Sequence, residues 1–180
     1  LTDHAEVFTE LKEYYKQTSE SDTTKISFYE DTYSLYNLYR FAHYYEEAYG
    51  KYIWLKSGAS LVIEHTEAMT VIDVNTGSVL KKKKQEDTLF YQINREAAKE
   101  IARQLRLRNI SGIIMIDFIN MKDTAQKEKL LSLLDSECKK DRVHCNVIDM
   151  TALNLVEMTR SKVRKPLHEQ IRSCMKNNRS

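Results

Sequence analysis

The chain has 180 residues, enough for one domain or for one domain with a small neighbour, and 42% of them are hydrophobic, so a substantial core can form. One proline and four glycines exclude a linker-rich or disordered chain, and a net charge of +2 does not by itself indicate a polyanion partner. Apolar runs fall well short of the ~20 residues that a membrane span needs, so we expect no membrane span. Three cysteines without C-x-x-C spacing favour reduced thiols and a cytoplasmic protein.

The first fifty residues are rich in tyrosine and are predicted to be mainly helical. Their apolar spacing predicts a helix over 3–16, a short strand over 25–29 and a helix over 35–48. Ten of the eleven tyrosines precede Ile53, so we expect a boundary near residue 50. Because the chain starts directly on a helix pattern without an initiator Met, we also expect it to be a fragment of a longer protein.

From residue 51 onward the pattern predicts strands that alternate with helices. The predicted strands cover 52–55, 60–63, 69–75, 113–117, 144–148 and 154–158, and the predicted helices cover 90–108, 124–139 and a short stretch after Pro166. The strand–helix–strand order around the helix 90–108 predicts a crossover between two parallel strands. The expected fold class is therefore α/β, with a mixed sheet flanked by helices.

Two aspartates end otherwise apolar strands, Asp73 in the first strand of this crossover and Asp117 in the second. Burying an ionised carboxylate without a partner costs several kcal/mol or more, so a shared cation is the favoured explanation. Asn75 lies two residues after Asp73 and shares its face of the strand. Two carboxylates and an amide carbonyl suit Mg²⁺, but spacing alone equally allows two aspartates that act as turn or cap residues.

Other polar residues carry weaker signals. The loop over 76–87 contains Lys81, Lys82, Lys83 and Lys84, which either form a solvated loop or contact phosphate. Arg106 and Arg108 flank the strand that ends at Asp117, and they too either contact phosphate or only cover the surface. His65 and Glu67 are candidates for general acid–base groups, although a lone histidine in a hairpin is more often exposed or hydrogen-bonded. The N-terminal tyrosines either stack on bases or pack in a core.

Five longer segments carry a resemblance to a known family: Trp54–Gly58, Leu61–Gly77, Asn94–Arg108, Gly112–Met121 and Leu155–Arg160. Together they resemble the ribonuclease E/G family across residues 53–164. The resemblance implies an RNase H-like segment over 1–50, a DNase I-like catalytic subdomain over 51–172 and a tail over 173–180.

The same resemblance implies a function. It implies an endoribonuclease that cuts single-stranded RNA and leaves a 5′-phosphate, with Mg²⁺ held by Asp73 and Asp117. Asn75 would orient the phosphate or the metal-bound water. Hydrolysis would use a metal-activated water that attacks phosphorus in line.

The chain also departs from the family pattern. The family's OB-fold RNA-binding domain does not precede Leu1, so we expect the isolated chain to cut RNA poorly. Its tail carries the single Cys174 where the family has a paired-cysteine zinc link, so a zinc link is not supported, and a homo-oligomer stays open. Asn120 and Ala59 replace a family aspartate and glycine. The alternative to a nuclease is a non-cleaving RNA-binding or assembly module of the same fold.

Overall fold

The computed structural model describes residues 1–18, 26–77 and 86–177. The chain divides into two compact units, Leu1–Glu47 and Ala48–Ser180. Whether these parts correspond to RNase H-like and DNase I-like subdomains stays a prediction. Among the helices of the described ranges, none has both the length and the apolar character that crossing a membrane requires.

The first unit is mainly helical, and it contains α1 (Ala5–Thr18), α2 (Leu35–Leu38) and the start of α3 (Phe41–Tyr49). The single helix predicted over 35–48 is wrong, because Arg40 has a φ of +51° and interrupts the helical backbone between α2 and α3. The strand predicted over 25–29 is also wrong over its described residues. Phe28 forms only an isolated bridge with Thr2, so no strand develops there.

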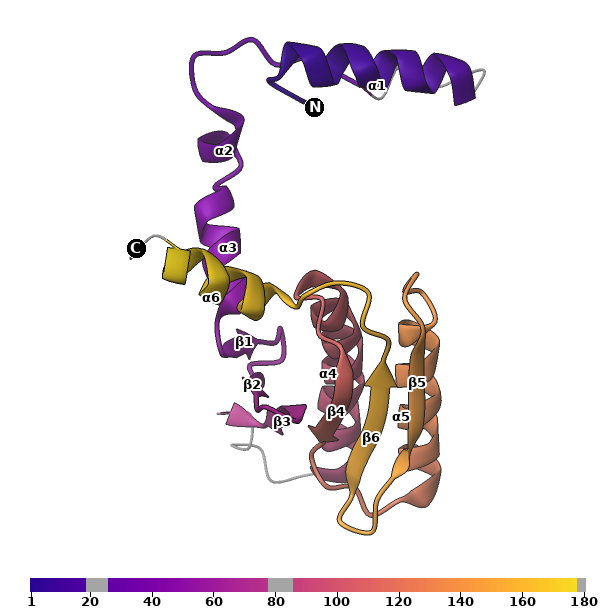
Figure 1. Ribbon diagram of the computed structural model, residues 1–180. Helices are drawn as coiled ribbons and strands as arrows, with labels where there is room; N and C mark the ends of the chain where they lie inside the picture. The colour runs from indigo at the N-terminus through magenta and orange to yellow at the C-terminus, as the bar shows by residue number, and fades with distance from the viewer. Residues whose placement is uncertain (19–25, 78–85, 178–180) are drawn as a thin grey trace. The chain divides into compact units, whose positions relative to one another are not determined.

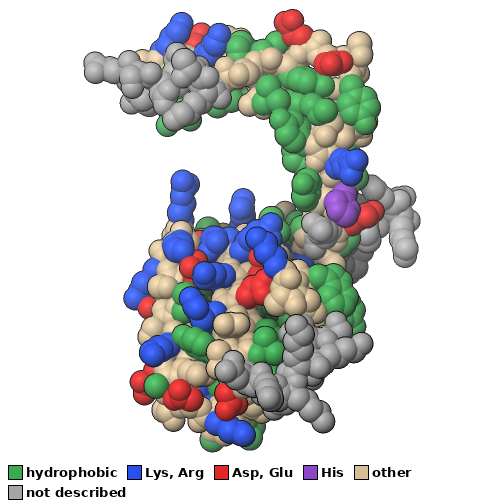
Figure 2. Space-filling model, turned by 180° about the vertical axis from the view of Figure 1, so that it is seen from behind, with side chains coloured by type: hydrophobic (Ala, Val, Ile, Leu, Met, Phe, Trp, Pro, Cys, Tyr) green, Lys and Arg blue, Asp and Glu red, His purple; other side chains and the backbone are tan. Residues whose placement is uncertain are grey.

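Large apolar side chains lie on the surface of this first unit. Figure 2 shows hydrophobic side chains gathered over the segment of α2 and α3, where Tyr36, Tyr39, Phe41 and Tyr44 are all exposed. We predicted that the N-terminal tyrosines either pack in a core or stack on bases. Core packing is wrong for Tyr36, Tyr39 and Tyr44, because all three are exposed. The other alternative, stacking on bases, stays a prediction.

The second unit is built on a six-stranded mixed sheet, which confirms the predicted fold class. Its elements are β1 (Tyr52–Trp54), β2 (Ser60–His65), β3 (Met69–Asn75), α4 (Glu86–Leu107), β4 (Gly112–Asp117), α5 (Thr124–Cys138), β5 (Cys145–Met150), β6 (Leu155–Arg160) and α6 (Leu167–Asn177). The strands lie in the order β1-β2-β3-β4-β6-β5. Only β3 and β4 pair in parallel, as the crossover through α4 predicted; the other neighbours are antiparallel.

Helices α4 and α5 pack side by side behind the strands β4, β6 and β5 (Figure 1). The apolar stripe of α4 faces the sheet, with Ile93, Ala97, Ile101 and Leu105 all at most 1% exposed. Fully burying a large aliphatic side chain contributes about 1.5–3 kcal/mol, so this stripe fixes α4 against the sheet.

The strands alternate between a buried face and an open face. In β3, Ile72 and Val74 are buried, whereas Asp73 is half-buried and Asn75 is exposed. In β4, Ile114 and Ile116 are buried, whereas Asp117 is exposed. Because successive side chains of a strand point to opposite faces, both aspartates lie on the face that α4 and α5 do not cover.

Candidate active site

Asp73 and Asp117 are direct partners in the parallel register of β3 and β4. Neighbouring strands lie about 4.8 Å apart, so the two side chains start from adjacent positions on the same open face. The prediction that the crossover brings both aspartates to one end of the sheet is confirmed. Their role as metal ligands stays a prediction.

Asn75 adds a polar amide to this pair. Its Nδ2 donates a hydrogen bond of 2.6 Å to Oδ2 of Asp73. This contact orients the Asp73 carboxylate and leaves its other oxygen available for a further partner. The three residues singled out from the sequence therefore form one cluster at the carboxyl ends of β3 and β4, where open α/β sheets carry their sites.

The electrostatics of the pair favour a bound cation. Partial burial, and next the nearby Asp73 carboxylate, raise the pKa of Asp117 above its ordinary value. A divalent ion between the carboxylates would remove this repulsion. Among the residues that the structure describes, no group of three or more histidine, cysteine or acidic side chains could hold a metal. Two carboxylates fit Mg²⁺, which is held by one or two carboxylates and keeps several waters.

Asn94 of α4 fixes the chain that follows Asp117. Its side chain is fully buried, donates to the Ile119 carbonyl at 2.8 Å and accepts from the Ile119 amide at 3.0 Å. This pair of bonds replaces the ladder contacts that Ile119 loses when β4 ends. The direction in which the backbone leaves Asp117 is therefore set by a side chain from the crossover helix.

Glu96, on the same helix, holds the turn between β1 and β2. Its two carboxylate oxygens accept hydrogen bonds from the backbone amides of Lys56 at 2.7 Å and Ser57 at 3.3 Å. The β1–β2 turn also lies close to the segment that follows Asn75. At Gly77, which has a φ of +57°, a Cβ atom would lie 2.5 Å from the carbonyl oxygen of Gly58. Only glycine fits such a close backbone approach at positive φ.

Two groups of basic residues were proposed to contact RNA. Lys81 to Lys84 fall outside the described residues. Arg106 lies in the last turn of α4 and Arg108 directly after it, near the start of β4 and thus at the end of the sheet opposite to Asp117. Arg106 lines a cavity of about 460 Å³ that is rich in cations: Arg106, Lys140, Arg142, Arg160 and Arg164.

Arg108 is only 4% exposed and makes contacts within the protein. Its Nε donates to Gln104 Oε1 and its Nη1 donates to the Gly50 carbonyl, both at 2.7 Å. These contacts fix residue 50 to the end of α4. RNA contacts by Arg106 and Arg108 stay predictions.

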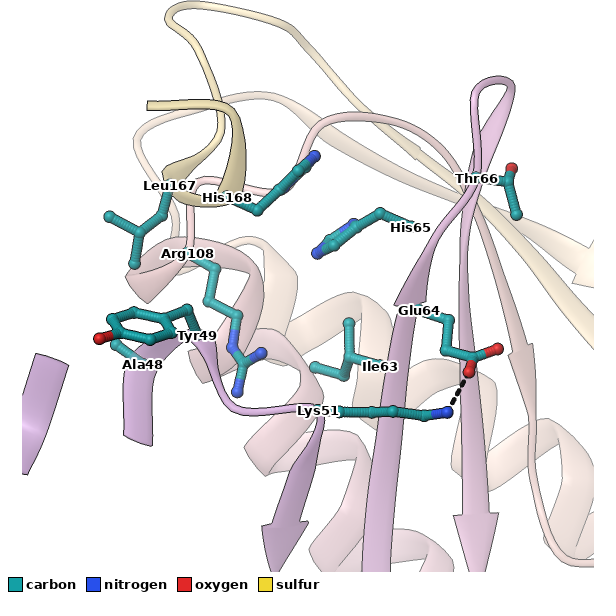
Figure 3. A pocket seen from close by; sticks show the side chains of 10 residues that line it. All are labelled: Ala48, Tyr49, Lys51, Ile63, Glu64, His65, Thr66, Arg108, Leu167 and His168. Atoms are coloured by element: carbon teal, nitrogen blue, oxygen red, sulfur yellow. Dashed lines mark ion pairs between the residues drawn. The ribbon is translucent and has the colours of Figure 1, made fainter. Parts of the chain in front are cut away.

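His65 lies in a second cavity, of about 450 Å³, which Arg108 also lines. Figure 3 shows its ring facing His168; the ring centroids are 3.8 Å apart and the planes differ by 13°. Burial, then the neighbouring His168 and Arg108, lower the pKa of His65 to about 4. His65 also pairs with Thr70, at the start of β3, so it lies away from the aspartates and on the other face of the sheet.

Sequence reasoning missed Asn94 and Glu96 as supporting residues. One signal was present for Asn94, which falls among the buried positions Ile93, Ala97 and Ala98 of an otherwise apolar stripe. A polar residue there needs a partner. Glu96 gave no such signal, because its partners are backbone amides about 40 residues earlier in the chain.

The chain is similar in sequence to known ribonucleases. The model of the Ribonuclease E/G family matches residues 1–163. Ribonuclease G of Haemophilus influenzae is 40% identical over 160 residues, which are 89% of this chain and 32% of that protein. Ribonuclease G of Escherichia coli K12 is 39% identical over 157 residues, 87% of this chain and 32% of that protein. Ribonuclease E of a Nostoc species is 35% identical over 162 residues, 88% of this chain and 23% of that protein.

The chain thus spans about a third of the length of these ribonuclease G relatives, or less in the case of ribonuclease E. The matched residues 1–163 include both aspartates, Asn75 and the supporting residues Asn94 and Glu96. This chain belongs to the ribonuclease E/G family.

Proposed function

We propose that this chain carries the catalytic centre of a Mg²⁺-dependent endoribonuclease that hydrolyses phosphodiester bonds of single-stranded RNA in RNA processing. The observation that supports it most is the in-register pair of Asp73 and Asp117 on an open sheet face. A protein that kept only the fold would gain nothing from two adjacent carboxylates, one of which, Asp117, has its pKa raised by partial burial and then by the other carboxylate. The names of the relatives, ribonucleases G and E, support the same reaction.

Asp73 and Asp117 would hold the ion, each through a carboxylate oxygen. When bound, Mg²⁺ supplies an activated water and positive charge that balances the phosphoryl oxygens. Asp73 would be held in place by the amide of Asn75, whose carbonyl oxygen then stays available to accept a hydrogen bond from the attacking water.

The helix α4 keeps the two carboxylates in register while RNA binds. Asn94 fixes the backbone after Asp117, and Glu96 fixes the turn that packs against Gly77 after Asn75. Catalytic groups that are set to within a fraction of an ångström by such supports need little reorganisation during the reaction.

The test is cleavage of a short unstructured RNA with the chain in excess over RNA, so that slow cutting is measured directly. We expect cleavage that needs a divalent ion and leaves a 5′-phosphate on the downstream product. Asp73→Asn and Asp117→Asn should each reduce the rate far more than tenfold, because a lost metal ligand costs several kcal/mol of barrier. Asp149→Asn removes the same charge from an exposed site on β5 and serves as the matched control.

Retention of more than a tenth of the rate would remove that aspartate from the metal site. If the unaltered chain binds the RNA but does not cut it under these conditions, the non-cleaving RNA-binding module becomes the better account.

A further inference from the structure

An exposed aromatic pair lies on the edge strand β1 of the same sheet. Tyr52 is 60% exposed and Trp54 is 73% exposed, whereas Ile53 between them packs against the core. The alternation places both aromatic side chains on the open face of the sheet. Two large exposed rings on one short strand offer a ligand flat surfaces for stacking, and the ammonium group of Lys51 lies 5.7 Å from the Tyr52 ring centroid.

The strand register connects this pair to the carboxylates. Tyr52 pairs with Val62, which pairs with Asp73, which pairs with Asp117. In the next row, Trp54 pairs with Ser60 and Ser60 with Asn75. Paired residues point to the same face, so the aromatic side chains and the acidic cluster share one surface. Two strand spacings separate Trp54 from Asn75, about 10 Å between their backbones.

A cation accompanies the aromatic pair. Lys56 follows Trp54 by two residues and is exposed, and its backbone is held by Glu96. Proteins that bind single-stranded nucleic acids combine aromatic rings, on which bases stack, with cations that contact the backbone. The open face thus carries two exposed aromatic rings and a carboxylate pair in adjacent rows, and an exposed cation follows Trp54 in the adjoining turn.

We propose that Trp54, with Tyr52 beside it, is a base-stacking site for a nucleotide of the RNA that lies close to the bond being cut. This inference rests on the proposed function, because it takes single-stranded RNA as the ligand. Stacking of a base on Trp54 would hold the RNA across β1 and β2 and deliver its backbone to Asp73 and Asp117.

Trp54 is the only tryptophan of the chain, so its fluorescence reports on this site alone. The test is a titration of the 180-residue chain with a short unstructured RNA in the presence of EDTA, which prevents cleavage. We expect saturable quenching of Trp54 fluorescence, and no quenching by an otherwise identical oligonucleotide with abasic residues, which keeps the phosphates but offers no rings.

Binding of fluorescently labelled RNA then measures the contribution of the ring. Trp54→Ala should weaken binding about 5- to 150-fold, the range for losing one stacked base, and Trp54→Phe should restore most of it. Ile148→Ala removes an exposed apolar side chain from the opposite edge strand β5 and should leave binding unchanged.

Three results would overturn the proposal: quenching that is equal for abasic RNA, unchanged binding by Trp54→Ala, or fluorescence that changes with protein concentration but not with RNA. The last result would show that a second copy covers this face. The proposed function is tested separately. RNA should still quench the Trp54 fluorescence of Asp73→Asn, because this variant keeps the aromatic ring. If Asp73→Asn loses cleavage but RNA does not quench the fluorescence of the unaltered chain, the proposed function stands and only the stacking proposal is refuted.

Discussion

Acidic side chains have opposite surroundings at the two ends of the six-stranded sheet. At the start of β4, Arg160 and Asp141 form an ion pair of 2.9 Å with both side chains less than 10% exposed, and Arg160 also donates to Asn109 and the Ile110 carbonyl. At the other end, Asp73 and Asp117 face each other with only the Asn75 amide as a described partner.

The pKa directions express the same difference. Burial alone would raise the pKa of Asp141, but hydrogen bonds from Arg160 and the Val143 amide, together with nearby arginine charge, lower it below its ordinary value. Burial and Asp73 raise the pKa of Asp117. One end is a satisfied structural network, and the other is an arrangement that, as we propose, a bound cation would make favourable. The contrast separates an acidic residue that holds the fold from the acidic residues that we propose for the chemistry.

The largest expected effect comes from breaking the satisfied end. Arg160→Met should lower the free energy of unfolding by about 3–5 kcal/mol, because it leaves Asp141 buried without its partner. Asp117→Asn at the other end should leave the thermal midpoint equal or higher, since it removes repulsion from Asp73. Chemical denaturation of both variants beside the unaltered chain measures the difference. Equal destabilisation by the two changes would contradict the contrast.

The next largest effect concerns Asn94, which holds the backbone after Asp117. Asn94→Ala should lower stability by about 2–4 kcal/mol, because the Ile119 amide and carbonyl lose their partners. Gln92→Ala, an exposed change on the same helix, is the matched control. Hydrogen exchange should show faster exchange at Ile119. Unchanged protection of that amide would mean that Asn94 does not hold the segment after β4.

A smaller loss of stability is expected at Gly77, whose backbone lies close to the Gly58 carbonyl. Gly77→Ala should cost about 1–3 kcal/mol for the positive φ, with a further shift of the β1–β2 turn to relieve the contact with Gly58. Gly112 also has a positive φ, of +89°, but a Cβ atom added there would meet open space. Gly112→Ala therefore separates backbone strain from collision. Equal losses of stability for the two variants would show that the collision contributes nothing.

The smallest effect concerns pH. Because the pKa of His65 is about 4 in the folded protein and near 6.5 when unfolded, the unfolded state binds the extra proton between these values. Stability should therefore fall as the pH is lowered from about 6.5 to 4. The thermal midpoint of His65→Gln should fall less steeply over that interval, and the exposed His144→Gln should follow the unaltered chain. If the thermal midpoint of His65→Gln fell as steeply as that of the unaltered chain, His65 would not be the source of this pH dependence.

Much of the second unit could be predicted from the sequence because its signals are local. Apolar runs and helical spacing located β3, α4 and β4, and the crossover order implied that two strand ends would meet. That order alone was enough to place Asp73 beside Asp117. The resemblance to the ribonuclease E/G family then turned two competing explanations of these aspartates into one favoured explanation.

The supports of the site could not be predicted in the same way, because they depend on contacts distant in the sequence. Asn94 meets Ile119 across 25 residues, and Glu96 meets Lys56 across 40. Arg108 looked like a surface cation, but the tertiary structure buries it against Gln104 and Gly50. The break at Arg40 was missed because a single left-handed residue leaves no mark on the apolar spacing of the helix.

The central claim is that Asp73 and Asp117 hold one divalent ion together. The most direct measurement is a crystal structure of the chain with Mn²⁺ in place of Mg²⁺, in which anomalous scattering locates the metal. We predict one peak on the open sheet face, about 2.1 Å from an oxygen of each aspartate. A metal bound by only one of them, or side chains turned apart with no ion between them, would contradict the account.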